Sequence, residues 1–106
     1  MKILKIEQRW DKHLAFKYFY LKDDVIIGTY TINGMDTGLN TFEGLWVHPE
    51  HRKTGLGTKM LETILATGLP LACLVHKDNW VFHLYEKHGF EYWYHENKEY
   101  YWMKNY

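Results

Sequence analysis

A short polar stretch near the middle of the sequence has the composition of a phosphate-binding loop. Arg52 and Lys53 come shortly before Gly55 and Gly57, and a run with helical periodicity begins at Leu56. The first turn of a helix carries unpaired N–H groups and the positive end of the helix dipole, which suit a phosphate. Glycine lets a bulky pyrophosphate approach the backbone, and the basic side chains add charge. The spacing is neither that of a P-loop nor that of a dinucleotide fingerprint, and it also fits a plain tight corner.

A second set of candidates comprises residues that could move a proton. Glu43 precedes Leu45 and Val47 at even spacing, so strand alternation predicts that the three side chains share one face. Glu43 could therefore reach a substrate amine, although an ordinary solvent-facing glutamate fits the same position. The histidine pairs have no zinc-site spacing and no cysteine partners, so we expect no metal site. The single cysteine, Cys73, lies in an apolar run and is expected to be a buried core thiol.

These candidates must be positioned by the elements around them. The apolar residues from Leu56 to Leu65 recur at helical spacing, and Gly68 with Pro70 ends that helix. Asp78 or Asn79 is expected to cap a second helix that runs to about residue 88. Residues 33–40 are rich in Gly and Asn and predict a loop. Strands are expected at 2–8, 14–21, 25–32, 41–47, 71–75, 90–95 and 100–104.

The resulting order is β-β-β-β-α-β-α-β-β, which predicts a mixed α/β fold. We expect a mostly antiparallel central sheet of about seven strands with two helices. Gly44 is a poor residue for a strand interior and predicts a bulge in the fourth strand. The chain of 106 residues is long enough for one domain, which we place at 1–106.

Composition excludes several classes of function. Thirteen Lys and Arg balance thirteen Asp and Glu, so no overall charge favours nucleic acid or an anionic membrane. No apolar run approaches the roughly 20 residues of a membrane span, and residues 1–5 lack the apolar core of a signal peptide. One cysteine fits a reducing compartment, so we expect a cytoplasmic protein.

Two ordered motifs resemble those of a known family. The run V-x-P-x-x-R-x-x-G-x-G occupies Val47–Gly57, and L-Y-E-K-x-G-F occupies Leu84–Phe90. With the closing Tyr101–Lys104, they resemble the GNAT superfamily of acetyl-coenzyme A-dependent N-acetyltransferases over roughly residues 41–104. Either motif alone is weak, but the ordered pair with an intervening strand is specific.

The resemblance implies that acetyl-CoA is the co-substrate and that it lies in a V between two splayed strands, one of which ends at Val47 and the other near His76. The backbone of residues 45–47 would bind pantetheine, and the amides of residues 52–57 would hold the pyrophosphate. The residues assigned in this way to the cofactor are Leu45, Trp46, Val47, Arg52, Lys53, Thr54, Gly55, Leu56, Gly57, Thr58, Asp78 and Asn79.

The resemblance also implies the reaction, which is direct transfer of the acetyl group to an amine without a covalent enzyme intermediate. The Val47 N–H would polarise the thioester carbonyl, and Tyr85 would protonate the leaving thiolate. Tyr85 could otherwise be a helix tyrosine that packs on the sheet. Glu43 is our candidate for the base, with His48 as a weaker one.

The sequence departs from the family pattern at three places. Asp78 stands where the family usually has Asn, with Asn79 one position late, and Val81 replaces a frequently small residue. Only about six residues, Arg9–His13 and their neighbours, join the first two strands, where most members have two helices. The acceptor side is therefore open, which suits an extended or macromolecular amine or closure by a second subunit in a homodimer. A non-catalytic acetyl-CoA-binding module that regulates a partner protein is the alternative function.

Overall fold

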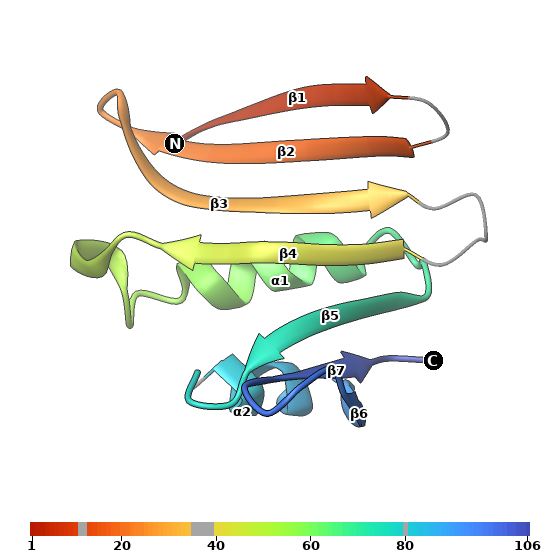
Figure 1. The fold of residues 1–106 in the computed structure, drawn as a ribbon. Helices are drawn as coiled ribbons and strands as arrows, with labels where there is room; N and C mark the ends of the chain where they lie inside the picture. Colours follow the sequence, from red (N-terminus) through yellow and green to blue (C-terminus); the bar gives the residue numbers. More distant parts are fainter. Residues whose placement is uncertain (11–12, 35–39, 80) are drawn as a thin grey trace.

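The computed structural model describes residues 1–10, 13–34, 40–79 and 81–106, which form a seven-stranded sheet and two helices (Figure 1). The elements follow one another in the predicted order, with a short 3-10 turn at Pro49–His51 before the first helix. Their bounds are β1 Lys2–Trp10, β2 His13–Lys22, β3 Val25–Gly34, β4 Asn40–Val47, α1 Leu56–Leu65, β5 Leu71–His76, α2 Val81–Lys87, β6 Glu91–His95 and β7 Tyr100–Lys104.

The strands lie in the order β1-β2-β3-β4-β5-β7-β6. All neighbours are antiparallel except β4 and β5, which are parallel. The predicted fold class, a mixed and mostly antiparallel sheet with two helices, is therefore confirmed. The β2–β3 hairpin turns through Asp23 and Asp24, whose φ angles of 52° and 64° are left-handed, as a two-residue hairpin turn of this hand requires.

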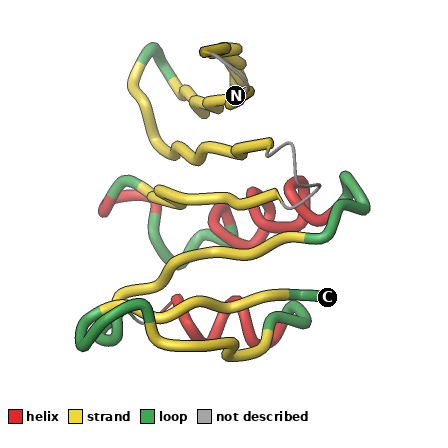
Figure 2. Tube along the Cα trace, turned by 45° about the vertical axis from the view of Figure 1, so that its right-hand side comes forward, coloured by secondary structure: helices red, strands yellow, loops and turns green. Residues whose placement is uncertain are grey.

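Both helices cover the same face of the sheet (Figure 2). Helix α1 buries Leu56, Met60, Leu61 and Ile64, the apolar stripe that its sequence periodicity predicts. Helix α2 adds Tyr85, whose ring meets the Phe42 ring of β4 edge-on at 5.4 Å between centroids. We call this side of the sheet the helix face. Among the described residues, no helix has the length and apolar character needed to cross a membrane.

The opposite side carries no helix in the described part of the chain, and we call it the open face. It bears Glu43, Trp46 and Leu74, which are all exposed. The structure thus has one apolar layer between sheet and helices, and one sheet surface that is available to other molecules (Figure 1).

Several element ends differ from the sequence prediction. Strand β1 continues to Trp10 and β2 begins at His13, so the expected connection is mostly strand, and its residues 11–12 lie outside the described chain. Most of the predicted 33–40 loop also lies outside the described residues. The Asn79 side chain accepts a hydrogen bond from the Val81 N–H at 3.1 Å, so of the two predicted capping residues it is Asn79 that meets the start of α2.

Candidate cofactor and active site

Strands β4 and β5 form a V on which the candidate site is built. They pair through only three residues each, and the last pair is Phe42 with Cys73. Beyond that pair β5 continues along β7 as far as His76, while β4 diverges from it (Figure 1). The V therefore opens between the C-terminal halves of two neighbouring parallel strands, where the family resemblance predicts it.

A bulge in β4 sets the direction of the side chains along one arm of the V. Thr29 pairs with Trp46 and Thr31 pairs with Glu43, so Gly44 and Leu45 together stand opposite one residue of β3. Gly44 has a φ of 65°, which favours glycine. The bulge predicted at this glycine is therefore present.

The bulge also overturns the predicted face of Glu43. Leu45 and Val47 pack against the core on the helix face, and a Cβ placed on Gly57 would lie 3.6 Å from Val47 Cγ2. Glu43 is exposed and lies opposite Thr31 on the open face. The prediction that Glu43 shares a face with Leu45 and Val47 was wrong, because the extra residue of the bulge shifts the alternation by one.

The same strand turns one peptide group into the V. The His48 N–H donates to the Ile27 carbonyl at 2.8 Å. Because antiparallel strands bond through alternate residues, Val47 directs its own N–H and C=O away from β3. Its carbonyl accepts a 2.9 Å hydrogen bond from Arg52 Nε, which leaves the Val47 N–H directed into the V. This is the donor that the resemblance assigns to the thioester oxygen.

The loop from Arg52 to Gly55 presents the start of α1 without a side-chain cap. Lys53 and Gly55 both have left-handed backbone, with φ angles of 63° and 88°, and Gly55 is the N-cap residue. The first backbone bond of the helix runs from Lys59 N–H to the Gly55 carbonyl, so the amides before Lys59 have no intrahelical acceptor. Such uncapped amides next to Arg52 and Lys53 form a suitable anion site.

Two adjoining cavities connect the V with this loop. Their volumes are about 260 Å³ and 410 Å³, and both are bounded by Arg52, Gly57 and Leu84. The first is also lined by Leu45, Trp46, Val47, Asn79 and Val81, and the second by Lys53, Gly55 and Thr58. The structure thus brings nine of the twelve predicted cofactor residues to these two neighbouring cavities, which we call together the hollow.

The other three predicted residues lie elsewhere. Leu56 is 8% exposed and belongs to the core, and Thr54 turns its hydroxyl to the His51 carbonyl at 2.5 Å. Asp78 lines neither cavity. Sequence reasoning missed Leu84, although it is the first residue of the second motif and lies three positions after Val81 on the same side of α2.

Tyr85 is deeply placed behind these cavities. Its side chain is 5% exposed and packs against Phe42 and Phe90, and it lines neither cavity. Burial, with a smaller effect from Cys73, raises the pKa of the Tyr85 phenol well above its usual value. Among the described residues, every side-chain nitrogen or oxygen atom that is fully buried has a hydrogen-bond partner. The Tyr85 hydroxyl, which has no partner, therefore keeps some contact with solvent.

His48 is held by the turn that follows β4. Its Nδ1 accepts a hydrogen bond from the Glu50 N–H at 3.1 Å, which places the proton of the neutral ring on Nε2. A second proton on this imidazole would break the turn's hydrogen bond, so His48 is poorly arranged to act as a base. Within the described ranges no three His, Cys, Asp or Glu side chains come together as a metal site.

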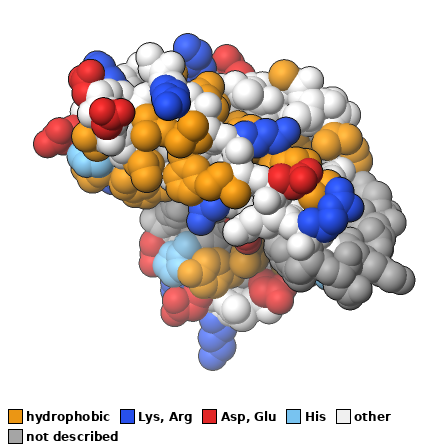
Figure 3. Space-filling view, turned by 90° about the horizontal axis from the view of Figure 1, so that it is seen from above, with side chains coloured by type: hydrophobic (Ala, Val, Ile, Leu, Met, Phe, Trp, Pro, Cys, Tyr) orange, Lys and Arg blue, Asp and Glu red, His pale blue; other side chains and the backbone are white. Residues whose placement is uncertain are grey.

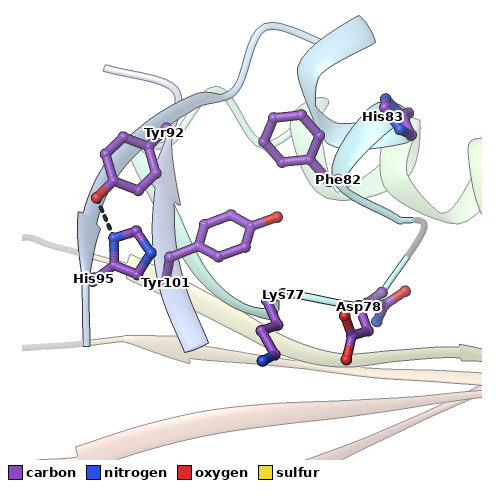
Figure 4. Close-up of a pocket in the computed structure, with 8 residues that line it drawn as sticks. Lys77, Asp78, Phe82, His83, Tyr92, His95 and Tyr101 are labelled. Carbon is purple, nitrogen blue, oxygen red and sulfur yellow. Dashed lines mark hydrogen bonds between the residues drawn. The ribbon is translucent and has the colours of Figure 1, made fainter. Parts of the chain in front are cut away.

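A third hollow of about 540 Å³ lies on the far side of α2 (Figure 4). Its aromatic walls are formed by Phe82, Tyr92 and Tyr101, and its rim by Lys77 and Asp78. The Tyr92 hydroxyl forms a hydrogen bond with His95 Nδ1. Asn79 borders both this hollow and the V, whereas Asp78 borders only this one. Asp78 and Asn79 are adjacent in the sequence, but only Asn79 is in a position to contact a ligand in the V.

Comparison with known proteins gives the same family as the motifs. A family model for the GNAT acetyltransferase domain matches residues 15–92, well over half of the chain. No curated protein matches the sequence.

Several solved structures share the fold. The PaiA N-acetyltransferase of Thermoplasma acidophilum, in complex with coenzyme A, is 24% identical with a TM-score of 0.67, over 90% of this chain and 62% of that one. An acetyltransferase of Thermus thermophilus is 23% identical with a TM-score of 0.70, over 88% and 63%. Arabidopsis thaliana Naa50, in complex with a bisubstrate analogue, is 18% identical with a TM-score of 0.70, over 83% and 70%.

This chain spans between 62% and 70% of the length of these three structures. At these sequence identities the solved structures establish a common fold, whereas the match to the family model establishes membership of the family. The V, the bulge and the uncapped helix start lie within the matched residues. The chain therefore belongs to the GNAT family of acetyltransferases and is by family an acyltransferase, as the two ordered motifs predicted.

Proposed function

We propose that this protein transfers the acetyl group of acetyl-CoA directly to an amine acceptor. The observation that carries the proposal is the pair of neighbouring cavities, bounded in common by Arg52, Gly57 and Leu84, that lie at the V of β4 and β5 and at the uncapped start of α1. The hollow offers amides and basic side chains at one end and the Val47 N–H at the other. Acetyl-CoA, the co-substrate of the family, has a pyrophosphate and a thioester that need these two kinds of group.

The phosphate end is bound by the loop before α1. Arg52 and Lys53 supply positive charge, and the free amides of the first helical turn supply hydrogen bonds. Gly57 leaves room for a ligand beside Val47, because it has no side chain. Thr58 and Leu84 complete the walls, one polar and one apolar. Asn79 lies beside the V and is the better candidate than Asp78 for a polar contact with pantetheine.

Transfer forms a C–N bond and breaks a C–S bond through an intermediate with a negatively charged oxygen. The Val47 N–H donates to that oxygen and costs no reorganisation, because the strand already holds it in place. The leaving group is the coenzyme A thiolate, whose conjugate acid is a thiol with a pKa of about 8.5. Tyr85 is protonated at neutral pH, since burial raises its pKa, and donates a hydrogen bond that strengthens as charge builds on sulfur. Because the phenol is a weaker acid than the thiol, it keeps its own proton, and the released thiolate takes a proton from water.

The proton lost by the amine goes to the opposite side of the sheet. Glu43 is exposed on the open face, next to the bulge that turns Val47 into the V. Glu43 precedes Val47 by four residues on the same strand, so an acceptor that approaches the V across this face would pass its carboxylate. Glu43 is therefore the proposed base, directly or through a water molecule, and the bare open face suits an amine carried by an extended or macromolecular substrate. A homodimer and a reducing, cytoplasmic location belong to the same proposal.

The alternative is a binding module that keeps the cofactor hollow but regulates a partner without turnover. The depth of Tyr85, which lines neither cavity, is the observation that favours it. Free thiol release from acetyl-CoA, measured with small amines, polyamines and peptides with free N-termini, distinguishes the two. Amine-dependent release of coenzyme A supports the enzyme. Binding of acetyl-CoA without release by any amine supports the module, and absence of binding overturns both.

A further inference from the structure

Strand β1 is an edge of the sheet, and no other described strand pairs with its outer side. It lies at the end of the strand order, and every residue from Met1 to Arg9 is exposed. Ile3, Leu4 and Ile6 keep 51%, 40% and 48% of their surface exposed, on both sides of the strand. Figure 3 looks down on this edge and shows apolar side chains among charged ones. The strand is nine residues long, has no proline and carries apolar as well as charged side chains, so its free backbone groups can pair with another chain whose charges are complementary.

The hydrogen bonds within the sheet determine which residues of β1 face outward. The bond from His48 to Ile27 and the alternation along β3 direct Thr29 towards β4 and Tyr30 towards β2. Tyr30 pairs with Tyr18, so the next residue of β2, Lys17, bonds to β1 opposite Ile6. Ile6 and every second residue from it therefore bond inward to β2. Ile3, Lys5, Glu7 and Arg9 present their backbone N–H and C=O groups outward.

These outward groups restrict how two copies of β1 can pair. In an antiparallel pair about a two-fold axis, outward residues must lie opposite outward residues, so the axis passes beside one residue of the strand. An axis at Lys5 or at Glu7 sets like charges directly opposite each other, which is unfavourable. An axis at Leu4 leaves the last residues of β1 without a partner. An axis at Ile6, the middle residue of β1, pairs the whole strand.

The charges are complementary in that same register. With the axis at Ile6, Lys5 of each copy lies opposite Glu7 of the other, twice across the interface. Both side chains lie on the side of the sheet where Lys5 Nζ is 4.2 Å from the centre of the Phe16 ring. Within the described part of the monomer neither residue has an ion-pair partner. On the open face, Ile6 meets Ile6 and Leu4 meets Gln8 of the other copy.

We propose that a second copy of this chain occupies the β1 edge, paired antiparallel about a two-fold axis at Ile6. The four outward residues of each strand then exchange about eight backbone hydrogen bonds. The two sheets continue into one, and the open face becomes one surface that runs across both copies. The candidate site is separated from this edge by β2 and β3, so each copy keeps its own V.

Disulfide formation tests the register directly. Opposite residues that do not share hydrogen bonds have Cα atoms about 4.5 Å apart, within the range of a disulfide. Ile6→Cys should therefore give a disulfide-linked dimer under mild oxidation. Leu4→Cys should not, because Leu4 lies opposite Gln8 in this register. Both positions are exposed, so the fold tolerates either change. The native Cys73 is 1% exposed, and burial raises its thiol pKa to about 12, so it does not compete.

Charge reversal tests the pairing without a covalent bond. Sedimentation of the wild type should show a concentration-dependent dimer. Lys5→Glu and Glu7→Lys should each weaken dimerisation at least tenfold, and the double variant Lys5→Glu/Glu7→Lys should restore it, since the opposite charges meet again. Circular dichroism and acetyl-CoA binding should not change in any of the three. A monomeric wild type at all concentrations, or equal cross-linking at positions 4 and 6, overturns the proposal.

Discussion

At the scale of single residues, Tyr85 is the proposed hydrogen-bond donor to the leaving sulfur, and this role depends on its hydroxyl group. Tyr85→Phe keeps the ring that packs on Phe42 and loses no hydrogen bond, so the fold and the affinity for acetyl-CoA should remain close to those of the wild type. The turnover number should fall by about 10²–10³-fold, the usual cost of removing one hydrogen-bond donor to a charge that develops in the transition state. Steady-state rates with a true acceptor check this. An unchanged turnover number would leave Tyr85 as a packing residue, provided that chemistry limits the rate.

Glu43 is the proposed base, and this role depends on its basic carboxylate oxygen. Glu43→Gln keeps the shape of an exposed side chain and removes its basic oxygen, so stability should not change. We expect kcat/KM to fall at neutral pH and to recover in part as pH rises, because alkyl amines have a pKa near 10.4 and more free amine becomes available. The matched control is His48→Ala, which should keep the wild-type pH profile. If the profiles of the two variants are exchanged, His48 is the base.

At the scale of elements, the proposed cofactor site is formed jointly by the start of α1 and the neighbouring strand β4. A Cβ on Gly57 would make an ordinary 3.6 Å contact with Val47, so Gly57→Val should fold. The larger side chain would fill the hollow that Gly57 borders in both cavities and should abolish binding. At a hundredfold excess over Kd, acetyl-CoA should stabilise the wild type by about 2.7 kcal/mol, which raises Tm by several degrees.

Differential scanning fluorimetry with and without acetyl-CoA measures this shift. Thr63→Val, which also introduces valine into the same helix but on its exposed side, serves as the control and should keep the wild-type shift. A normal shift in Gly57→Val would place the cofactor elsewhere, and no shift in the wild type would contradict acetyl-CoA binding.

At the scale of the whole molecule, the core contains buried groups that ionise only at high pH. Burial raises the pKa of Cys73 from 9.0 to about 12, and it raises the pKa values of Tyr30 and Tyr85 above their usual range. Above pH 9 the unfolded chain releases protons that the folded chain keeps, so the free energy of unfolding should fall steadily as pH rises. Urea denaturation at neutral pH and at about pH 11 measures the loss. Cys73→Ala should reduce the slope between about pH 9 and pH 12, and an unchanged slope would contradict the burial of this thiol.

The sequence by itself determined the features that depend on neighbouring residues. The spacing of Leu56, Met60 and Ile64 predicted α1, and Gly44 predicted the bulge, because helical periodicity and left-handed backbone are local properties. The order of elements and the family followed in the same way from turn residues and from two short motifs. These predictions agree with the folded structure because each depends on conformational preferences of residues that are close together in the sequence.

Tertiary structure alone decided which of these residues meet. One extra residue in β4 moved Glu43 to the face opposite Val47, since side-chain direction changes at every position of a strand. Leu84 lines the hollow, Tyr85 lies behind it, and Asp78 faces another surface, because the packing of α2 against the sheet decides which side of the helix is buried. The exposure of β1 likewise depends on the strand order, which is fixed by long-range pairing that no local pattern encodes.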